Sequence, residues 1–273
     1  MVDPPTETMD VLYAKWNAPF AAVFTETANK SVTIQAASEL HRHMELDSAT
    51  SVLEVASGAG IGSLDILKYL ESSTAPSKSF RITDFSPAMI ELAKQNVNPA
   101  KYEFPVDIEL ANGQDLVNVT DGSVDRYIAS FVLQMAPDPE AMLQEAYRVL
   151  EVGGIAGFVI WGRPEESGWF TILHNIEPDA VTNWNNFYMG QDIPKLRETF
   201  KRIGFSSVLA WTKLCVAEKW SAARHADYVA SRNPKQDKDA EAAFYAKVLQ
   251  ASQEWLDSGK PIGLETYLIL AKK

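Results

Sequence analysis

Short apolar segments alternate with amphipathic segments between Ser51 and Trp161, and this alternation is the strongest constraint on the fold. The segments SVLEVAS, FRITDF, VDIELANG, SVDRYIASFVL and IAGFVIW have the length and composition of strands. SLDILKYL, SPAMIELAKQNV and PEAMLQEAYRVL separate them with helical apolar spacing. Strands that alternate with helices are joined by right-handed crossovers, which produce a mainly parallel sheet with helices on both faces. We therefore predict a doubly wound α/β core.

The flanking segments extend this core. SSVLAWTKLCV and PIGLETYLILA predict a sixth and a seventh strand, and DIPKLRETFKRIGF predicts a helix that ends at Gly204. The Gly153–Gly154 pair is expected to end the helix before the fifth strand. We divide the chain into an N-terminal helical lid (1–48), a core (49–163), an aromatic-rich, irregular cap segment (164–190) and the rest of the core (191–273), with a helical insertion at about 218–258.

Composition narrows the function. The 36 acidic residues outnumber the 25 basic ones, and a net charge of -11 disfavours a nucleic-acid partner. Cys215 is the one cysteine, so an intramolecular disulfide and a cysteine zinc site are excluded, and no His, Cys and acid cluster has metal-ligand spacing. The N-terminus lacks the pattern of a signal peptide and no segment is long enough to span a membrane. These features predict a cytoplasmic monomer or homodimer without a membrane partner.

The turn after the first predicted strand is glycine-rich but does not match a phosphate-binding loop. Gly58 to Gly62 reads GAGIG, which departs from the G-x-G-x-x-G dinucleotide pattern, and no Gly-Lys-Ser/Thr follows. Glu54 ends the strand, where its carboxylate is badly placed for a pyrophosphate and well placed for a cationic amine. The turn therefore favours a ligand with an ammonium group and makes a nicotinamide oxidoreductase a weaker alternative.

Four motifs in order resemble the class I S-adenosylmethionine-dependent methyltransferases. VLEVASGAG resembles their first motif, Asp84 stands where the family has a ribose-binding acid, ANGQDL resembles D-A-x-D-L, and residues 124–154 are similar to the fourth strand, its loop and the following helix. Ala56 replaces the first family glycine, so we expect an ordinary backbone angle there. The resemblance implies S-adenosylmethionine as cofactor and S-adenosylhomocysteine as product. It implies these cofactor-binding residues: Glu54, Ala56, Ser57, Gly58, Gly60, Asp84, Phe85, Met89, Asn112, Gly113, Gln114, Ser130 and Phe131.

Aromatic residues and histidines outside the core are candidates for the acceptor side of the site. They either pack the cap onto the sheet or line an apolar pocket, and Tyr13 and Trp16 are the best lid candidates. The other acceptor or lid candidates are Gln134, Trp169, Trp184, Tyr188 and Trp220. His174 and His225 are weak candidates for a general base, whereas His41 and His43 are expected to be solvated.

The resemblance predicts methyl transfer to a small hydrophobic or aromatic metabolite on oxygen, nitrogen or sulfur, with carbon left open. The fourth strand runs into ASFV. It lacks the Asn-Pro-Pro-aromatic segment of enzymes that methylate nitrogen in nucleic acids and proteins. Two alternatives remain: an enzyme of the same fold that uses the bound cofactor for a non-methylating reaction, and a catalytically inactive binding subunit.

Overall fold

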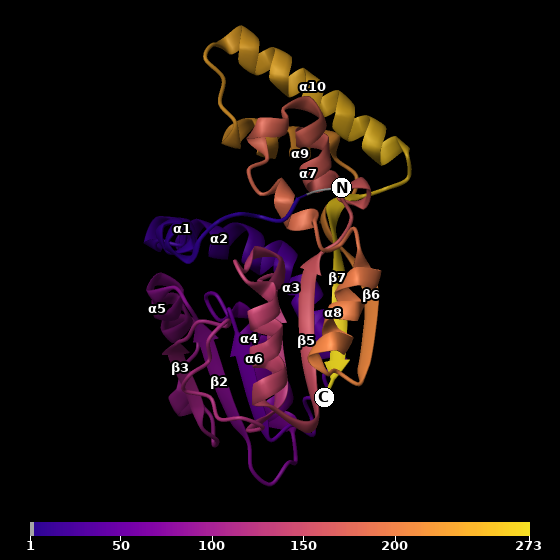
Figure 1. Ribbon diagram of the computed structural model, residues 1–273. Coiled ribbons are helices and arrows are strands. Elements are labelled where there is room, and N and C mark those ends of the chain that lie inside the picture. The colour runs from indigo at the N-terminus through magenta and orange to yellow at the C-terminus, as the bar shows by residue number, and fades with distance from the viewer. Residues whose placement is uncertain (1–2) are drawn as a thin grey trace.

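The computed structural model describes residues 3–273, and its centre is a seven-stranded sheet (Figure 1). The strand order is β3-β2-β1-β4-β5-β7-β6. β7 runs antiparallel to both of its neighbours, and the other adjacent pairs are parallel. The predicted doubly wound, mainly parallel sheet is confirmed. Its strands are β1 (Ser51–Val55), β2 (Ser79–Asp84), β3 (Val106–Leu110), β4 (Val124–Ser130), β5 (Leu150–Trp161), β6 (Ser207–Glu218) and β7 (Ile262–Lys272).

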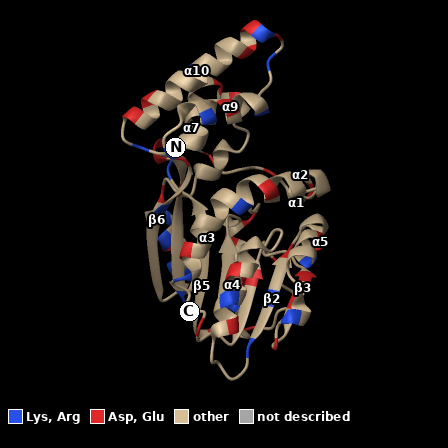
Figure 2. Ribbon diagram, turned by 180° about the vertical axis from the view of Figure 1, so that it is seen from behind, with Lys and Arg blue, Asp and Glu red and all other residues tan. Residues whose placement is uncertain are grey.

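Helices cover both faces of the sheet. In Figure 1, α6 (Pro139–Val149) and α8 (Ile193–Ile203) lie in front of it, and Figure 2 shows α3 (Ile34–His41) and α4 (Ile61–Ser72) on the opposite face. The remaining helices are α1 (Met9–Lys15), α2 (Ala18–Phe24), α5 (Pro87–Asn96), α7 (Gly168–Ile176), α9 (Ala222–Arg232), α10 (Lys238–Asp257), the π-helix η1 (Thr25–Thr33) and five short 3-10 turns, η2 (Pro99–Lys101), η3 (Leu133–Met135), η4 (Pro164–Glu166), η5 (Pro178–Ala180) and η6 (Trp184–Phe187).

Local sequence signals explain where the helices next to the site begin. The Ser86 hydroxyl accepts a hydrogen bond from the backbone N–H of Met89, and Pro87 occupies the first position of α5. Asp138 caps α6 in the same way through the N–H of Ala141, again followed by proline. A side-chain cap satisfies an otherwise free N–H, and proline has no N–H to satisfy. Both helices therefore begin directly after the carboxyl end of a strand or the loop that follows it.

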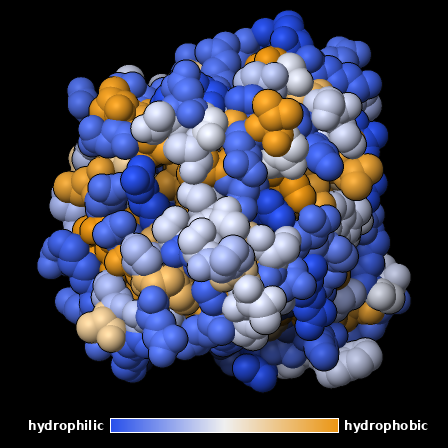
Figure 3. All heavy atoms as spheres, turned by 90° about the horizontal axis from the view of Figure 1, so that it is seen from below, coloured by the Kyte–Doolittle hydropathy of each residue, from blue (hydrophilic) through white to orange (hydrophobic). Residues whose placement is uncertain are grey.

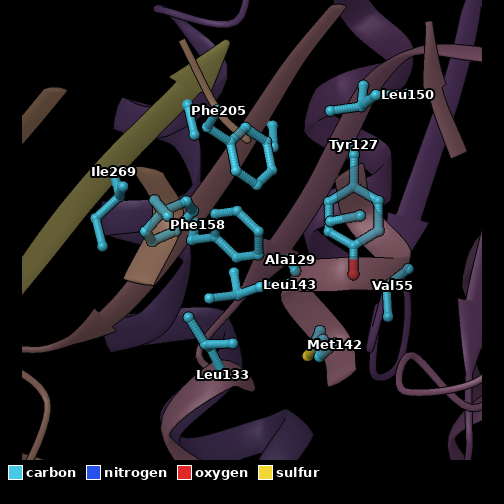
Figure 4. Close-up of a cluster of buried hydrophobic side chains, with 14 of the residues drawn as sticks. Val55, Tyr127, Ala129, Leu133, Met142, Leu143, Leu150, Phe158, Phe205 and Ile269 are labelled. Atoms are coloured by element: carbon cyan, nitrogen blue, oxygen red, sulfur yellow. The ribbon is translucent and has the colours of Figure 1, made fainter. Parts of the chain in front are cut away.

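The core on the α6 and α8 side is built from large apolar side chains of the two central strands. Tyr127 of β4 and Phe158 of β5 are fully buried, and Phe158 packs against Phe200 of α8 at 5.4 Å between ring centroids. Figure 4 shows Tyr127, Phe158 and Phe205 filling the space between the sheet and these helices. This layer fixes the carboxyl ends of β1 and β4 relative to each other.

Two local predictions about element boundaries were wrong. The helix before the fifth strand ends at Val149, and Gly153 and Gly154 lie inside β5, which starts five residues earlier than expected. The segment 164–190 is not irregular throughout, because Gly168–Ile176 forms α7. The helix α7 packs with α9 and α10 into a helical cap. The core of this cap includes Ala226, Val229, Phe244 and Val248.

The surface agrees with the acidic composition. Lys and Arg are interspersed with Asp and Glu over the helices seen in Figure 2. Seen from below, away from the cap, the molecule is mainly hydrophilic with small apolar patches (Figure 3). Among the described helices, none has the length and apolar character needed to cross a membrane.

Candidate functional site

The strand order reverses between β1 and β4, and a hollow opens at their carboxyl ends. From β1 the chain continues to β2 and then β3 on one side of β1, and it then returns to β4 on the other side of β1. In open α/β sheets this reversal leaves a crevice where ligands bind. The hollow encloses about 50 Å³, or about 470 Å³ when the open solvent at its mouth is included. It is lined by Met9, Leu12, Trp16, Val55, Ala56, Phe85, Ala111, Asn112, Gly113, Gln114, Val132, Met135, Ala136, Pro137 and Met142.

The turn after β1 has a left-handed backbone, and it includes Ala56. The φ angles of Ala56, Gly58 and Gly60 are 55°, 57° and 76°. The expectation of an ordinary angle at Ala56 was wrong: the turn requires the left-handed conformation even where the family glycine is absent. An L-residue with a side chain pays roughly 1–2 kcal/mol there. Since Ala56 lines the hollow, this strain lies at the site itself.

Asp84 ties the turn to the end of β2. Its carboxylate is 4% exposed and accepts hydrogen bonds from the N–H of Gly58 at 2.8 Å and of Ser86 at 2.9 Å. Burial raises the pKa of Asp84 to about 6, and the backbone N–H groups partly oppose this rise. The second strand therefore presents a buried acceptor beside the glycine turn.

Glu54 lies behind the turn and does not line the hollow. Its carboxylate is 5% exposed, and the Ser63 hydroxyl in the first turn of α4 donates a hydrogen bond to it. Burial raises the pKa of Glu54 to about 8, while the Ser63 hydrogen bond acts in the other direction and the nearby Asp84 adds to the rise. A buried carboxylate in this state responds strongly to a cation placed near the turn.

The segment after β3 forms the next wall of the hollow. The Asn112 side-chain oxygen accepts from the N–H of Gln114 at 3.1 Å and from its side-chain amide at 3.3 Å. The Gln114 amide also contacts the sulfur of Met9 at 3.2 Å, and its oxygen accepts from the N–H of Asp138 at 2.6 Å. Gln114 thus links the β3 loop to both the lid helix α1 and the start of α6.

We expect Gly113→Ala to destabilise the protein by about 1–3 kcal/mol, because a Cβ atom there overpacks the wall. The added carbon would stand 2.6 Å from Val55 Cγ1 and 3.2 Å from Met142 Cε. Urea unfolding measures the change. Val55→Ala removes the closest atom, so the double variant should lose less stability than the two single changes added together; strict additivity would contradict the proposed contact.

The N-terminal helices close over the hollow. Trp16 lines it, and Tyr13 packs edge-on against Phe85 at 5.0 Å. The Ser86 hydroxyl donates to the carbonyl of Trp16 at 2.8 Å, which fastens the end of α1 to the start of α5. Met89, predicted to bind the cofactor, is 1% exposed beneath this lid.

The loop after β4 holds a second left-handed residue. Phe131 has a φ of 63°, and its N–H donates to the carbonyl of Val159 at 2.7 Å. The Gln134 amide donates to the Phe131 carbonyl at 3.2 Å. Among the described residues, the buried side-chain oxygens of Ser57, Ser130 and Gln134 have no hydrogen-bond partner. Three buried polar atoms near the ends of β1 and β4 are thus left unpaired, although their residues do not line the hollow.

Of the seven predicted acceptor or lid candidates, only Trp16 lines the hollow. Trp169 packs on Tyr228 at 4.8 Å, Trp184 stacks on His174 at 3.6 Å, Tyr188 packs against the core, and Trp220 is 87% exposed. His225 is buried, with Nδ1 2.8 Å from the Ser252 hydroxyl, and burial lowers its pKa to about 4.

His41 is not solvated as predicted. It is 1% exposed and its Nδ1 lies 2.9 Å from Asp65, so it joins α3 to α4. Burial lowers its pKa. The side chain of His43 is half-exposed, in keeping with the expectation for that residue.

The structure adds lining residues that the motifs did not identify. Met9 and Leu12 join Trp16 on one face of α1, and Met135 and Pro137 follow β4. The spacing of three and four residues between Met9, Leu12 and Trp16 is the signal that marks one side of a helix. Read with the lid prediction, it would have identified this face.

Comparisons with known proteins agree on the class of domain. Residues 53–158 match the family model described as "Methyltransferase domain". A chloroplastic 2-methyl-6-phytyl-1,4-hydroquinone methyltransferase from Oryza sativa is 32% identical over 118 residues, which cover 43% of this chain and 31% of that protein. The ubiquinone/menaquinone biosynthesis C-methyltransferase UbiE from a Geobacter species is 29% identical over 157 residues, which cover 58% of this chain and 60% of that protein. The matches thus span between a third and three fifths of these relatives.

A solved structure shows how far the fold extends. The [4+2]-cyclase SpnF superimposes with a TM-score of 0.62 at 14% identity and covers 99% of this chain and 98% of that one. At this identity the likeness concerns the fold alone, so the reaction has to be argued from the site.

Proposed function

We propose that this chain transfers a methyl group from S-adenosylmethionine to a small hydrophobic or aromatic metabolite. The chain belongs to the class I S-adenosylmethionine-dependent methyltransferases, and its matched domain spans residues 53–158. The observation that carries the proposal is the pair of buried carboxylates, Glu54 and Asp84, on either side of the left-handed turn at Gly58. A cofactor that joins an ammonium group to a ribose needs this combination.

The residues of the hollow fit this cofactor. Asp84 does not line the hollow, but its carboxylate lies beside the glycine turn and would accept from the ribose hydroxyls. The apolar lining residues Phe85, Ala111 and Met142 suit an adenine ring. Glu54 would attract the ammonium group through its charge from behind the turn. The unpartnered oxygens of Ser57 and Ser130 are buried near the ends of β1 and β4 and would offer further polar contacts to a bound cofactor.

The remaining work of the protein is positioning and exclusion of water. When bound, the cofactor supplies an electrophilic methyl group on a sulfonium centre. The lid residues Met9, Leu12 and Trp16 shield that side of the hollow, and the β4 loop holds the opposite side. Alignment of the donor and the attacking atom in a dry site supplies most of the acceleration that a displacement of this type needs.

For the acceptor, we propose a hydroquinone or a related phenolic ring. Two curated relatives are named for quinone or hydroquinone methylation, and one of them is named a C-methyltransferase. A ring carbon activated by an ionised hydroxyl is therefore the first candidate atom, ahead of the hydroxyl oxygen itself. The apolar lining and the aromatic cap residues favour such a ring over a charged acceptor.

Product analysis tests the function. The purified protein is incubated with S-adenosylmethionine and a panel of substituted hydroquinones, and we expect a product heavier by one methylene together with S-adenosylhomocysteine. NMR of the product identifies the methylated atom. An altered acceptor with unconsumed cofactor would support the non-methylating alternative, and absence of cofactor binding would support an inactive subunit.

A further inference from the structure

Asn29 lies over the glycine turn, although no motif in the sequence points to it. It belongs to η1, the π-helix that joins α2 to α3. Its side-chain nitrogen Nδ2 is 3.7 Å from the point where a Cβ atom of Gly58 would stand. The π-helix is rare and is often found at functional sites. The lid therefore brings a polar amide to the same turn whose Gly58 N–H donates a hydrogen bond to Asp84.

A neighbouring hydroxyl contacts this amide and orients it when the hydroxyl donates to the side-chain oxygen. Thr33 Oγ1 lies 3.1 Å from Asn29 Oδ1 and 3.3 Å from the Asn29 backbone carbonyl, so the hydroxyl donates to an oxygen at either position. With Oδ1 accepting, Nδ2 is the atom that faces the turn. The side-chain amide of Asn96 differs from that of Asn29, because it donates a hydrogen bond to the carbonyl of Ala59 at 2.9 Å and so stabilises the glycine turn. Among the hydrogen bonds of the described residues, none has Asn29 Nδ2 as donor to a carbonyl of the turn.

The proposed cofactor has one anionic group, the carboxylate of its amino-acid moiety, and this group needs donors. Neither lysine nor arginine is present among the described residues that line the hollow. The lysines and the arginine of the lid are already paired: Lys15 lies 3.2 Å from Glu7, Lys30 lies 2.6 Å from Glu26, and Arg42 lies 3.7 Å from Glu39. Glu54 and Asp84 are acceptors and cannot bind a carboxylate while ionised. A neutral N–H donor is required.

We propose that Asn29 binds the carboxylate of the cofactor's amino-acid moiety through Nδ2 and that Thr33 positions its amide. The inference rests on the proposed function, since it assumes that S-adenosylmethionine occupies the hollow. It assigns a binding role to a lid residue, so the lid both covers the cofactor and recognises the end opposite the adenine.

Calorimetry with two ligands tests this assignment without any turnover. S-adenosylhomocysteine carries the amino-acid moiety, whereas 5′-methylthioadenosine lacks it. Asn29→Ala should weaken binding of the first at least about tenfold, the usual effect of losing a hydrogen bond to a charged group, and change binding of the second less than about twofold. Asn29→Asp places a negative charge at the same point and should weaken the first ligand further. Thr33→Val should give an intermediate loss.

The controls separate this inference from the proposed function. Lys30→Ala changes the next residue of η1, which is exposed, and should retain wild-type affinity for both ligands. If the wild-type protein binds neither ligand, the proposed function itself fails. If it binds both and Asn29→Ala and Asn29→Asp leave S-adenosylhomocysteine affinity unchanged, or weaken both ligands equally, Asn29 does not contact the carboxylate. Thermal melts confirm folding, and Thr33→Val decides the matter if an Asn29 variant fails to fold.

Discussion

Asp84→Ala is expected to weaken S-adenosylmethionine binding by about 3 kcal/mol, roughly a hundredfold. The substitution removes the proposed acceptor for the ribose hydroxyls. It also leaves the N–H groups of Gly58 and Ser86 without their partner, so the turn itself loses a restraint. Because both effects act on the same ligand, the loss should exceed that of a single hydrogen bond. Isothermal titration with S-adenosylhomocysteine measures it.

Two further variants distinguish a specific role from a general one. Asp84→Asn keeps one side-chain oxygen and should lose less affinity than Asp84→Ala. Asp107→Ala removes an exposed acid from the neighbouring strand β3 and should bind as the wild type does. Wild-type affinity in Asp84→Ala would refute the assignment of this carboxylate to the cofactor.

Without ligand, Asp84→Asn should lack the fall in stability that ionisation of Asp84 causes in the wild type between about pH 4 and about pH 6. Burial raises the pKa of Asp84 to about 6, so the folded protein binds this proton more tightly than the unfolded chain does. Ionisation of Asp84 therefore costs stability as the pH rises from about 4 to about 6, and this cost persists at higher pH. A neutral amide avoids it. Melting temperatures of the two proteins measured from pH 4 to pH 8 provide the comparison, because the loss of one backbone hydrogen bond in Asp84→Asn affects every pH alike.

The sequence predicted the parts of the fold that are encoded locally. The Ser86–Pro87 start of α5 and the alternation of strands and helices follow from neighbouring residues, and both are present in the structure. Of the predicted cofactor residues, eight do not line the hollow, namely Glu54, Ser57, Gly58, Gly60, Asp84, Met89, Ser130 and Phe131, whereas Ala56, Phe85, Asn112, Gly113 and Gln114 do. They come together because the carboxyl ends of adjacent parallel strands meet at one edge of the sheet.

The features that the sequence did not reveal depend on contacts between distant segments. The angle at Ala56 is imposed by the turn between β1 and α4 and not by alanine, which disfavours it. His41 is buried because α3 packs on α4, where the carboxylate of Asp65 forms a hydrogen bond with Nδ1 of His41. Asn29 reaches Gly58 only because the lid folds back over the turn. The positions of the cap histidines and tryptophans relative to the acceptor also depend on contacts between distant segments, so the sequence alone did not predict them.

Cofactor affinity is expected to rise about tenfold between pH 6 and pH 7.5. Burial raises the pKa of Glu54 to about 8, so most of this carboxyl is protonated at pH 6 in the free protein. A bound ammonium group favours the ionised form and lowers this pKa, and each pKa unit corresponds to about 1.4 kcal/mol of coupling. Affinity therefore increases as the pH approaches 8, where the ammonium group itself begins to lose its proton.

Stability of the free protein should change in the opposite direction over this range. The pKa of Glu54 is higher in the folded protein than in the unfolded chain, so the folded state holds more protons between about pH 4.5 and pH 8. Its contribution to the free energy of unfolding is fully present below this range and is lost as the pH rises through it. Saturating S-adenosylhomocysteine should offset that loss, which melting curves with and without ligand will show.

Glu54→Gln identifies the group responsible. The amide cannot ionise, so this variant should bind the cofactor weakly at every pH and lose most of the pH dependence above pH 6.5, where Asp84 is already ionised. Glu109→Gln changes a partly exposed carboxylate on β3 that pairs with Arg81, and it should keep the wild-type profile. A wild-type slope in Glu54→Gln would assign the titration to another group. A flat wild-type profile would show that Glu54 is not coupled to the ammonium group, in which case the carboxylate stabilises the start of α4 through Ser63 instead of attracting the ligand.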